Sequence, residues 1–100
     1  MGVPSTVDQA RSQILTDAVR VSISGTTARS TALPSGMYLA TSDVECRIKQ
    51  GGSTITVTTS TGIPLWSKGY LEIYVDATTD AYIAGITTGA TGTLELCKVS

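Results

Sequence analysis

The sequence predicts an all-β fold: a single antiparallel β-sandwich of about seven to eight short strands with jelly-roll-like topology. Apolar and polar residues alternate with a period of two through most of the chain from Val19 onward. Turns containing glycine or proline recur roughly every 8–12 residues, which is the spacing of sandwiches and barrels. Serine and threonine make up more than a quarter of the residues, a composition that suits solvated strand faces.

The first strands are predicted from local alternation and one turn. Residues 19–24 alternate between apolar and polar side chains, which is typical of a half-buried strand. The polar residues 25–30 are expected to form a loop. The Leu-Pro-Ser-Gly sequence at 33–36 predicts a turn, because proline suits its second position and glycine its fourth. A strand follows in which Met37 and Leu39 share one face.

A tight β-hairpin is predicted at Gly51 and Gly52, since two glycines separate two alternating segments. Pairing across this turn sorts apolar residues to one face and polar residues to the other. It places the following apolar residues opposite each other: Ile48 and Ile55, and Cys46 and Val57. A slip of one residue would destroy that sorting.

Three further strands are expected in the last third of the chain. In residues 70–75 the sequence predicts Leu71, Ile73 and Val75 in the core, with Tyr70, Glu72 and Tyr74 facing outward. Residues 76–80 form a loop, and residues 82–86 form a strand with a bulge at Gly85. The last strand covers residues 93–99, with Leu94 and Leu96 facing inward.

The first residues differ from the rest, so we divide the chain into residues 1–17, an N-terminal arm or short helix, and residues 18–100, the β-sandwich domain. Ser5 and Asp8 have the spacing of a helix capping box. A set of apolar residues has helical spacing, namely Val7, Ala10, Ile14 and Ala18. The alternative is an extended arm that lies on a neighbouring subunit.

Composition argues against an enzyme. The chain has no histidine, which removes the commonest general base and metal ligand. Cys46 and Cys97 have no metal-binding spacing and are expected to be free thiols of a protein made in a reducing cytoplasm. We therefore predict no catalytic residues, no cofactor and no metal site.

Charge and hydropathy limit the partners. The net charge is −1 with no cluster of basic residues, so no nucleic acid is expected. No segment approaches the ~20 apolar residues of a membrane helix, so no membrane is expected. The predicted partner is protein, and a glycan is the less favoured ligand.

Five residues are the predicted contact residues of a protein interface: Ile14, Leu15, Trp66, Tyr70 and Tyr74. Tryptophan and tyrosine are enriched at interfaces. If the strands that carry them are neighbours, Tyr70 and Tyr74 would form a semi-apolar outer patch with Cys97 and Val99. The alternative is that loops or the N-terminal segment cover this patch.

Three stretches carry a family resemblance: LPSGMYLATSDVECRIKQGG, IPLWSKGYLEIYV and YIAGITTGATGTLELCKVS. With turns at Pro34–Gly36 and Gly89–Leu94, they resemble small virion proteins of tailed bacteriophages and prophages, over about residues 33–100. The resemblance implies a capsid decoration, head–tail or tail accessory role, synthesis in the bacterial host cytoplasm and a final location in the virion. It implies no functional residues.

Two hypotheses follow. The first is a non-enzymatic virion structural or accessory protein that forms a homo-oligomer, a dimer or trimer, and binds the capsid or tail. The alternative is a small β-sandwich module on a phage tail that binds a host glycan or receptor. Trp66 at the floor of a groove beside Asp43 or Asp76 would favour the alternative.

Overall fold

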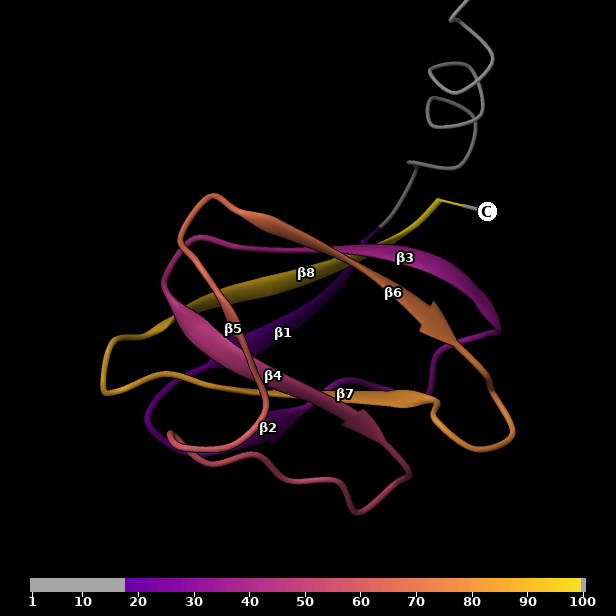
Figure 1. Ribbon diagram of the computed structural model, residues 1–100, viewed down its shortest axis with the longest axis horizontal. Coiled ribbons are helices and arrows are strands. Elements are labelled where there is room, and N and C mark those ends of the chain that lie inside the picture. The colour runs from indigo at the N-terminus through magenta and orange to yellow at the C-terminus, as the bar shows by residue number, and fades with distance from the viewer. Residues whose placement is uncertain (1–17, 100) are drawn as a thin grey trace, which may run out of the picture.

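The computed structural model describes residues 18–99, which fold as two four-stranded antiparallel sheets packed face to face (Figure 1). This confirms the predicted all-β sandwich. Ile14, Leu15 and the rest of the predicted arm or helix lie outside the described residues. The strands are β1 (Val19–Ile23), β2 (Ala28–Arg29), β3 (Gly36–Ser42), β4 (Cys46–Gly51), β5 (Ile63–Leu65), β6 (Tyr70–Val75), β7 (Tyr82–Ile86) and β8 (Gly92–Lys98).

The strand pairs are nested. Sheet A has the order β1-β8-β3-β6 and sheet B the order β2-β7-β4-β5. Thus β1 pairs with β8, β2 with β7, β3 with β6 and β4 with β5, all antiparallel. Every connection except β4–β5 crosses from one sheet to the other. The edge strands are therefore β1 and β6 in sheet A, and β2 and β5 in sheet B.

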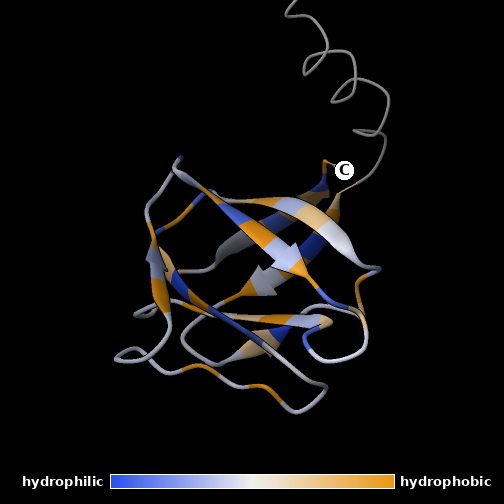
Figure 2. Cartoon of the chain, turned by 45° about the vertical axis from the view of Figure 1, so that its right-hand side comes forward, coloured by the Kyte–Doolittle hydropathy of each residue, from blue (hydrophilic) through white to orange (hydrophobic). Residues whose placement is uncertain are grey.

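Buried side chains from both sheets form the core between them. Figure 2 shows hydrophobic and hydrophilic residues alternating along strands of both sheets. In β6, Ile73 and Val75 are buried and Leu71 is half-buried, whereas Tyr70, Glu72 and Tyr74 are exposed. Leu94 and Leu96 of β8 are fully buried. These inward residues agree with the alternation read from the sequence. In β3, Tyr38 and Ala40 face the core, so Met37 and Leu39 share the outer face.

Gly85 is not a bulge. It pairs in register with Ile48 of β4 and with Ala28 of β2, and neither ladder contains an extra residue. A Cβ at Gly85 would lie 3.0 Å from Cγ2 of Ile23 and 3.4 Å from Cδ2 of Leu94, both in sheet A. The glycine therefore permits the two sheets to approach closely at this point.

The predicted hairpin at Gly51 and Gly52 is wrong. In sheet B, β4 pairs with β7 on one side and with β5 on the other, where Ile48 lies opposite Ile63 and Cys46 opposite Leu65. Residues 52–62 form a long loop instead of a returning strand. The apolar residues Ile55 and Val57 of this loop pack on β7 instead of pairing with β4, so no tight turn at Gly51 and Gly52 is needed.

The loop covers the outer face of sheet B. Val57 is buried against Ala84 and Ile86 of β7, and Ile55 packs beside them. The backbone N–H of Val57 donates to Oγ1 of Thr27 at 3.1 Å. Two arginines of sheet B also donate hydrogen bonds to the loop. Arg29 donates to the carbonyl of Ile55 at 3.4 Å, and Arg47 donates to the carbonyl of Gly62 at 3.0 Å. As a result, β7 is buried on both faces.

Candidate functional site

Exposed large apolar side chains gather on one side of the sandwich. In the described part of the chain they are Ile63, Trp66, Tyr70 and Tyr74, each 55–68% exposed. All four lie on β5, on β6 or in the turn that joins them (Figure 1). Because β5 and β6 are edge strands of opposite sheets, neither has a strand on its outer side in the described part of the chain. We name residues 63–75 the β5–β6 edge.

Three of the five predicted contact residues, Trp66, Tyr70 and Tyr74, thus lie on the β5–β6 edge. Tyr70 and Tyr74 turn to the outer face of sheet A, whereas Trp66 shares a hollow with Arg47 of sheet B. Ile63 was not predicted. The sequence pattern that could have identified it is apolar–Pro–apolar at residues 63–65. This pattern indicates a short edge strand, because proline is tolerated at sheet edges.

The turn that presents Trp66 is tied to the rest of the sandwich. The N–H of Gly69 donates to the carbonyl of Trp66 at 2.9 Å, and Lys68 has a positive φ of 64°. The N–H of Lys68 donates to the carbonyl of Ser42 at 3.0 Å, and Ser67 Oγ to that of Asp43 at 3.2 Å. These bonds to the end of β3 and the residue after it hold the turn in place, with Trp66 62% exposed.

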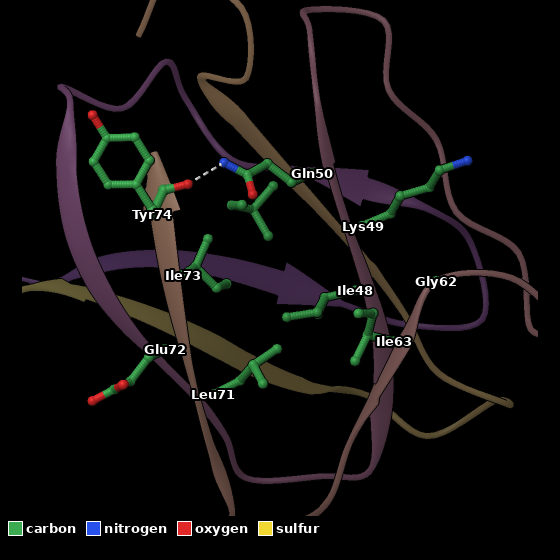
Figure 3. A pocket seen from close by; sticks show the side chains of 10 residues that line it. Ile48, Lys49, Gln50, Gly62, Ile63, Leu71, Glu72, Ile73 and Tyr74 are labelled. Carbon is green, nitrogen blue, oxygen red and sulfur yellow. Dashed lines mark hydrogen bonds between the residues drawn. The ribbon is translucent and has the colours of Figure 1, made fainter. Parts of the chain in front are cut away.

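An open cleft of about 520 Å³ lies between the edge of sheet A and the edge of sheet B (Figure 3). Gln50 bridges the two sheets there, since its Nε2 donates to the carbonyl of Tyr74 at 2.7 Å. Aliphatic side chains from four strands form most of the lining, and they are Ile48, Ile63, Leu71, Ile73 and Ile83. Lys49 and Glu72 also contribute to the lining. An aliphatic lining with few polar groups suits another apolar side chain better than a charged ligand.

The outer edge of β6 presents its backbone to solvent. The carbonyl of Met37 accepts from the N–H of Val99 at 2.8 Å and so points toward β8. Met37 is paired with Tyr74 across the β3–β6 ladder, so this pair is the non-hydrogen-bonded kind. The N–H and C=O of Tyr74 therefore point away from β3, consistent with the bond from Gln50. By alternation, the backbone groups of Tyr70 and Glu72 point to the same outer edge.

The predicted outer patch has a different composition. Tyr70 and Tyr74 on β6 are not beside Cys97 on β8, because β3 lies between them. Leu39 of β3 pairs with Cys97 on one side and with Glu72 on the other. The half-buried Met37 and Leu39 thus connect the two parts of the patch.

A second hollow of about 210 Å³ has Trp66 in its wall, together with Glu45, Arg47 and Pro64. The predicted carboxylates do not line it. Asp43 accepts the N–H of Thr93 at 2.8 Å through Oδ1, and Asp76 follows β6 at the end away from Trp66. The carboxylate that shares a hollow with Trp66 is Glu45.

The two cysteines are free and lie on different sheets. Cys46 is buried in the core, and Cys97 is half-buried on the outer face of sheet A. Burial is the largest cause that raises the pKa of each thiol above its ordinary value. Both therefore remain protonated and poorly nucleophilic near neutral pH.

Among residues 18–99, no group of three or more Cys, Asp, Glu or His side chains is arranged to hold a metal ion. The same residues contain no helix long and apolar enough to cross a membrane.

Comparison with known proteins gives no relative: no protein-family model, no curated protein and no solved structure matches the chain.

Proposed function

We propose that this chain is a non-catalytic binding protein that self-associates and attaches to another protein through its β5–β6 edge. The setting implied by the sequence resemblance is the virion of a tailed phage, on the capsid or the tail. The observation that carries the proposal is the gathering of Ile63, Trp66, Tyr70 and Tyr74, all more than half exposed, on one side of the sandwich.

The chemistry of this edge favours a protein partner. Tryptophan and tyrosine dominate the residues whose truncation weakens protein interfaces, and each buries about 150–250 Å² when fully covered. Monomeric proteins rarely expose large continuous apolar patches. The bonds that hold the backbone of the Trp66 turn also favour binding, because a turn that is already ordered loses less conformational freedom on association.

We infer that the sandwich has jelly-roll topology. The support is the nesting of four antiparallel pairs, in which β1–β8 encloses β2–β7, then β3–β6, then β4–β5. Double-sheet jelly rolls are common in viral capsid and lectin domains. This analogy at the level of the fold agrees with both hypotheses and does not choose between them.

Composition supports the non-catalytic part of the proposal. The chain contains no histidine, and burial raises the pKa of both thiols. A cysteine nucleophile ordinarily needs a lowered pKa and an adjacent base.

The first test is absolute mass by size-exclusion chromatography with light scattering, across a dilution series of the full chain. We expect a dimer or larger oligomer at micromolar concentration, which Trp66→Ala weakens. Ser22→Ala, an exposed position on β1, is the control and should behave as wild type. A monomer at every concentration contradicts self-association.

The second test concerns the virion. Particles from a lysate of the host strain that carries the gene are separated on a density gradient and probed with an antibody against the chain. We expect to find the chain in the particle fraction. Added Trp66→Ala protein should compete poorly with the wild-type chain for binding to the particles. A chain found only in the soluble fraction contradicts a virion role.

One observation favours glycan binding as a second candidate. Trp66 shares its hollow with Glu45 and Arg47, so an aromatic platform lies beside a carboxylate and a guanidinium. Glycan-array binding that is lost in both Trp66→Ala and Glu45→Gln would support this candidate. No binding by the wild-type chain would remove it.

A further inference from the structure

We propose that β6 of one copy pairs antiparallel with β6 of a second copy, about a twofold axis at Glu72. The two copies of sheet A would then form one continuous sheet across the dimer. This inference rests on the proposed self-association and specifies its geometry.

The outer edge of β6 has backbone donors and acceptors that can form such a pair. Its N–H and C=O groups at Tyr70, Glu72 and Tyr74 point away from β3, and no strand lies on that side in the described part of the chain. An edge of this kind is a template for a further strand. A donor and an acceptor at every second residue are self-complementary in an antiparallel pair.

The β6 edge lacks several of the devices that protect other edges, and its one charge is Glu72. It has six residues in unbroken register with β3, so it carries no bulge, and it contains no proline. By contrast, β2 has two residues, and β5 has three residues including Pro64. On β1, the edge strand at the other side of sheet A, Arg20 is paired with Glu95 at 3.2 Å. Of these edges, β6 is the one best suited to pairing.

The side chains of β6 read almost the same in both directions, as Tyr-Leu-Glu-Ile-Tyr. In an antiparallel pair centred on Glu72, Tyr70 lies opposite Tyr74 of the second copy. Leu71 lies opposite Ile73 of the second copy on the inner face. Aromatic pairs directly across two strands stabilise a sheet. This near-palindrome is the reason to choose a second copy as the occupant rather than an unrelated strand.

The cleft supports the same occupant. A strand added beside β6 turns its alternate side chains toward the space between the sheets. Leu71 and Ile73 of the second copy would therefore face the mouth of the cleft, whose lining already includes Leu71, Ile73 and Ile63. On the outer face, each edge tyrosine would contact the tyrosine opposite it, which covers part of its exposed surface.

One feature of this register opposes association. Glu72 lies opposite Glu72 of the second copy, and like charges directly across two strands destabilise the pair. The Gln50 bond to the Tyr74 carbonyl does not block the ladder, because a carbonyl oxygen has a second lone pair. The charge at the twofold axis gives the proposal its most specific test.

The test exchanges the charge at Glu72. Glu72→Lys should form a homodimer no tighter than the wild type, since two lysines then lie opposite each other. An equimolar mixture of the wild type and Glu72→Lys should form mixed dimers with a Kd about three- to tenfold lower than either homodimer. Native mass spectrometry with one isotope-labelled chain measures the three species. If mixed dimers form only in the proportion expected for random association, the register with Glu72 opposite Glu72 is wrong.

Disulfide trapping provides a second readout. In a Cys97→Ser background, Glu72→Cys should oxidise to a covalent dimer by itself, because the Cα atoms of a hydrogen-bonded pair lie about 5.5 Å apart. Tyr70→Cys and Tyr74→Cys should cross-link when mixed and not alone. In either variant alone, the two introduced cysteines are offset by four residues, about 13 Å along the strand, which is too far for a disulfide.

The outcomes separate this inference from the proposed function. A dimer that Trp66→Ala weakens, without the mixed-dimer preference and without the cross-links, overturns the β6 pairing and leaves self-association in place. A chain that is monomeric at every concentration overturns both. A monomer that binds particles and loses this binding on Glu72→Pro shows that β6 accepts a strand of another protein, which also overturns the second copy as occupant.

Discussion

Gln50 and Tyr74 connect the two sheets across the open side of the sandwich, through a 2.7 Å hydrogen bond from Gln50 Nε2 to the Tyr74 carbonyl. The same nitrogen also donates to the carbonyl of Asp80 at 3.1 Å. Gln50 belongs to β4, Tyr74 to β6, and Asp80 to the loop before β7. A single side chain thus ties one end of the cleft to the loop that follows the edge strand.

We expect Gln50→Ala to destabilise the fold by about 0.5–1.5 kcal/mol, the usual net contribution of a neutral hydrogen bond. The bonds are exposed, so water can replace the lost donor and the lower half of this range applies. Urea unfolding monitored by Trp66 fluorescence measures the change. Lys49→Ala, the exposed neighbour on β4, is the control. A loss in Gln50→Ala no larger than that of the control would contradict a bridging role.

Three loop glycines, Gly52, Gly62 and Gly89, should differ in how well they tolerate substitution by alanine. Gly62 has a φ of +82°, and a Cβ there would lie 2.6 Å from the carbonyl oxygen of Ile48 and 2.8 Å from Cγ2 of Val57. Gly62→Ala should therefore cost more than about 1 kcal/mol, from backbone strain and crowding together. Gly89 has a φ of +144° with nothing within 4 Å of such a Cβ, so Gly89→Ala should cost less.

Gly52→Ala is the sharpest of these comparisons. The nearest atom to a Cβ at Gly52 is the carbonyl oxygen of Thr79, at 4.0 Å, and its φ is not positive. We expect this substitution to change stability by less than about 0.5 kcal/mol. Thermal unfolding of the three variants tests the order. A large loss at Gly52 would instead support the tight hairpin that the sequence predicted.

The sequence predicted the inward residues of β6 correctly and the hairpin at Gly51 and Gly52 wrongly, for one physical reason. In β6 one face is buried, so the alternation of Leu71, Ile73 and Val75 determines which residues face inward without knowledge of the neighbouring strands. Ile55 and Val57 alternate equally well, but alternation does not say which sheet face they cover. The surface that they cover, Ala84 and Ile86, is distant in sequence.

The sequence did contain a sign of this second layer. Residues 83–86 are Ile-Ala-Gly-Ile without a polar residue, which is the pattern of a strand buried on both faces. A second cover for β7 was therefore required, and residues 55–57 supply it. For the site, the outward direction of Tyr70 and Tyr74 followed from alternation. Their position on the same open side as Trp66 and Ile63 depends on the strand order, which local patterns do not contain.

The thiols should react in two steps. Cys97 is half-buried on an outer face, and Cys46 is buried in the core. Titration of the native chain with a disulfide reagent should modify one thiol per chain slowly at pH 7 and faster as the pH rises, because only the thiolate reacts. The second thiol should appear only in denaturant. Cys97→Ser should remove the native reaction, and two rapidly reacting thiols in the native chain would contradict the structure.

Asp76 should link stability to acid pH. Its Oδ1 accepts the hydroxyl of Thr78 at 2.6 Å and the N–H of Thr78 at 3.0 Å. These bonds favour the carboxylate, so the folded pKa of Asp76 lies below its ordinary value of 3.8. The unfolded chain then binds the proton more readily. The stabilisation is fully present above the unfolded pKa and is lost as the pH falls through the lower, folded pKa.

Asp76→Asn should therefore be less stable than the wild type at pH 7, and the difference should shrink as the pH falls below the ordinary pKa of 3.8 and through the lower, folded pKa. Thr78→Val, which lacks the hydroxyl and keeps the N–H, should show the same trend with a smaller amplitude, because the hydroxyl bond is the largest cause of the lowered pKa. Urea unfolding of the three chains between pH 2 and pH 7 measures the effect. A constant difference between Asp76→Asn and the wild type over this range would show that the carboxylate charge contributes nothing to the loop.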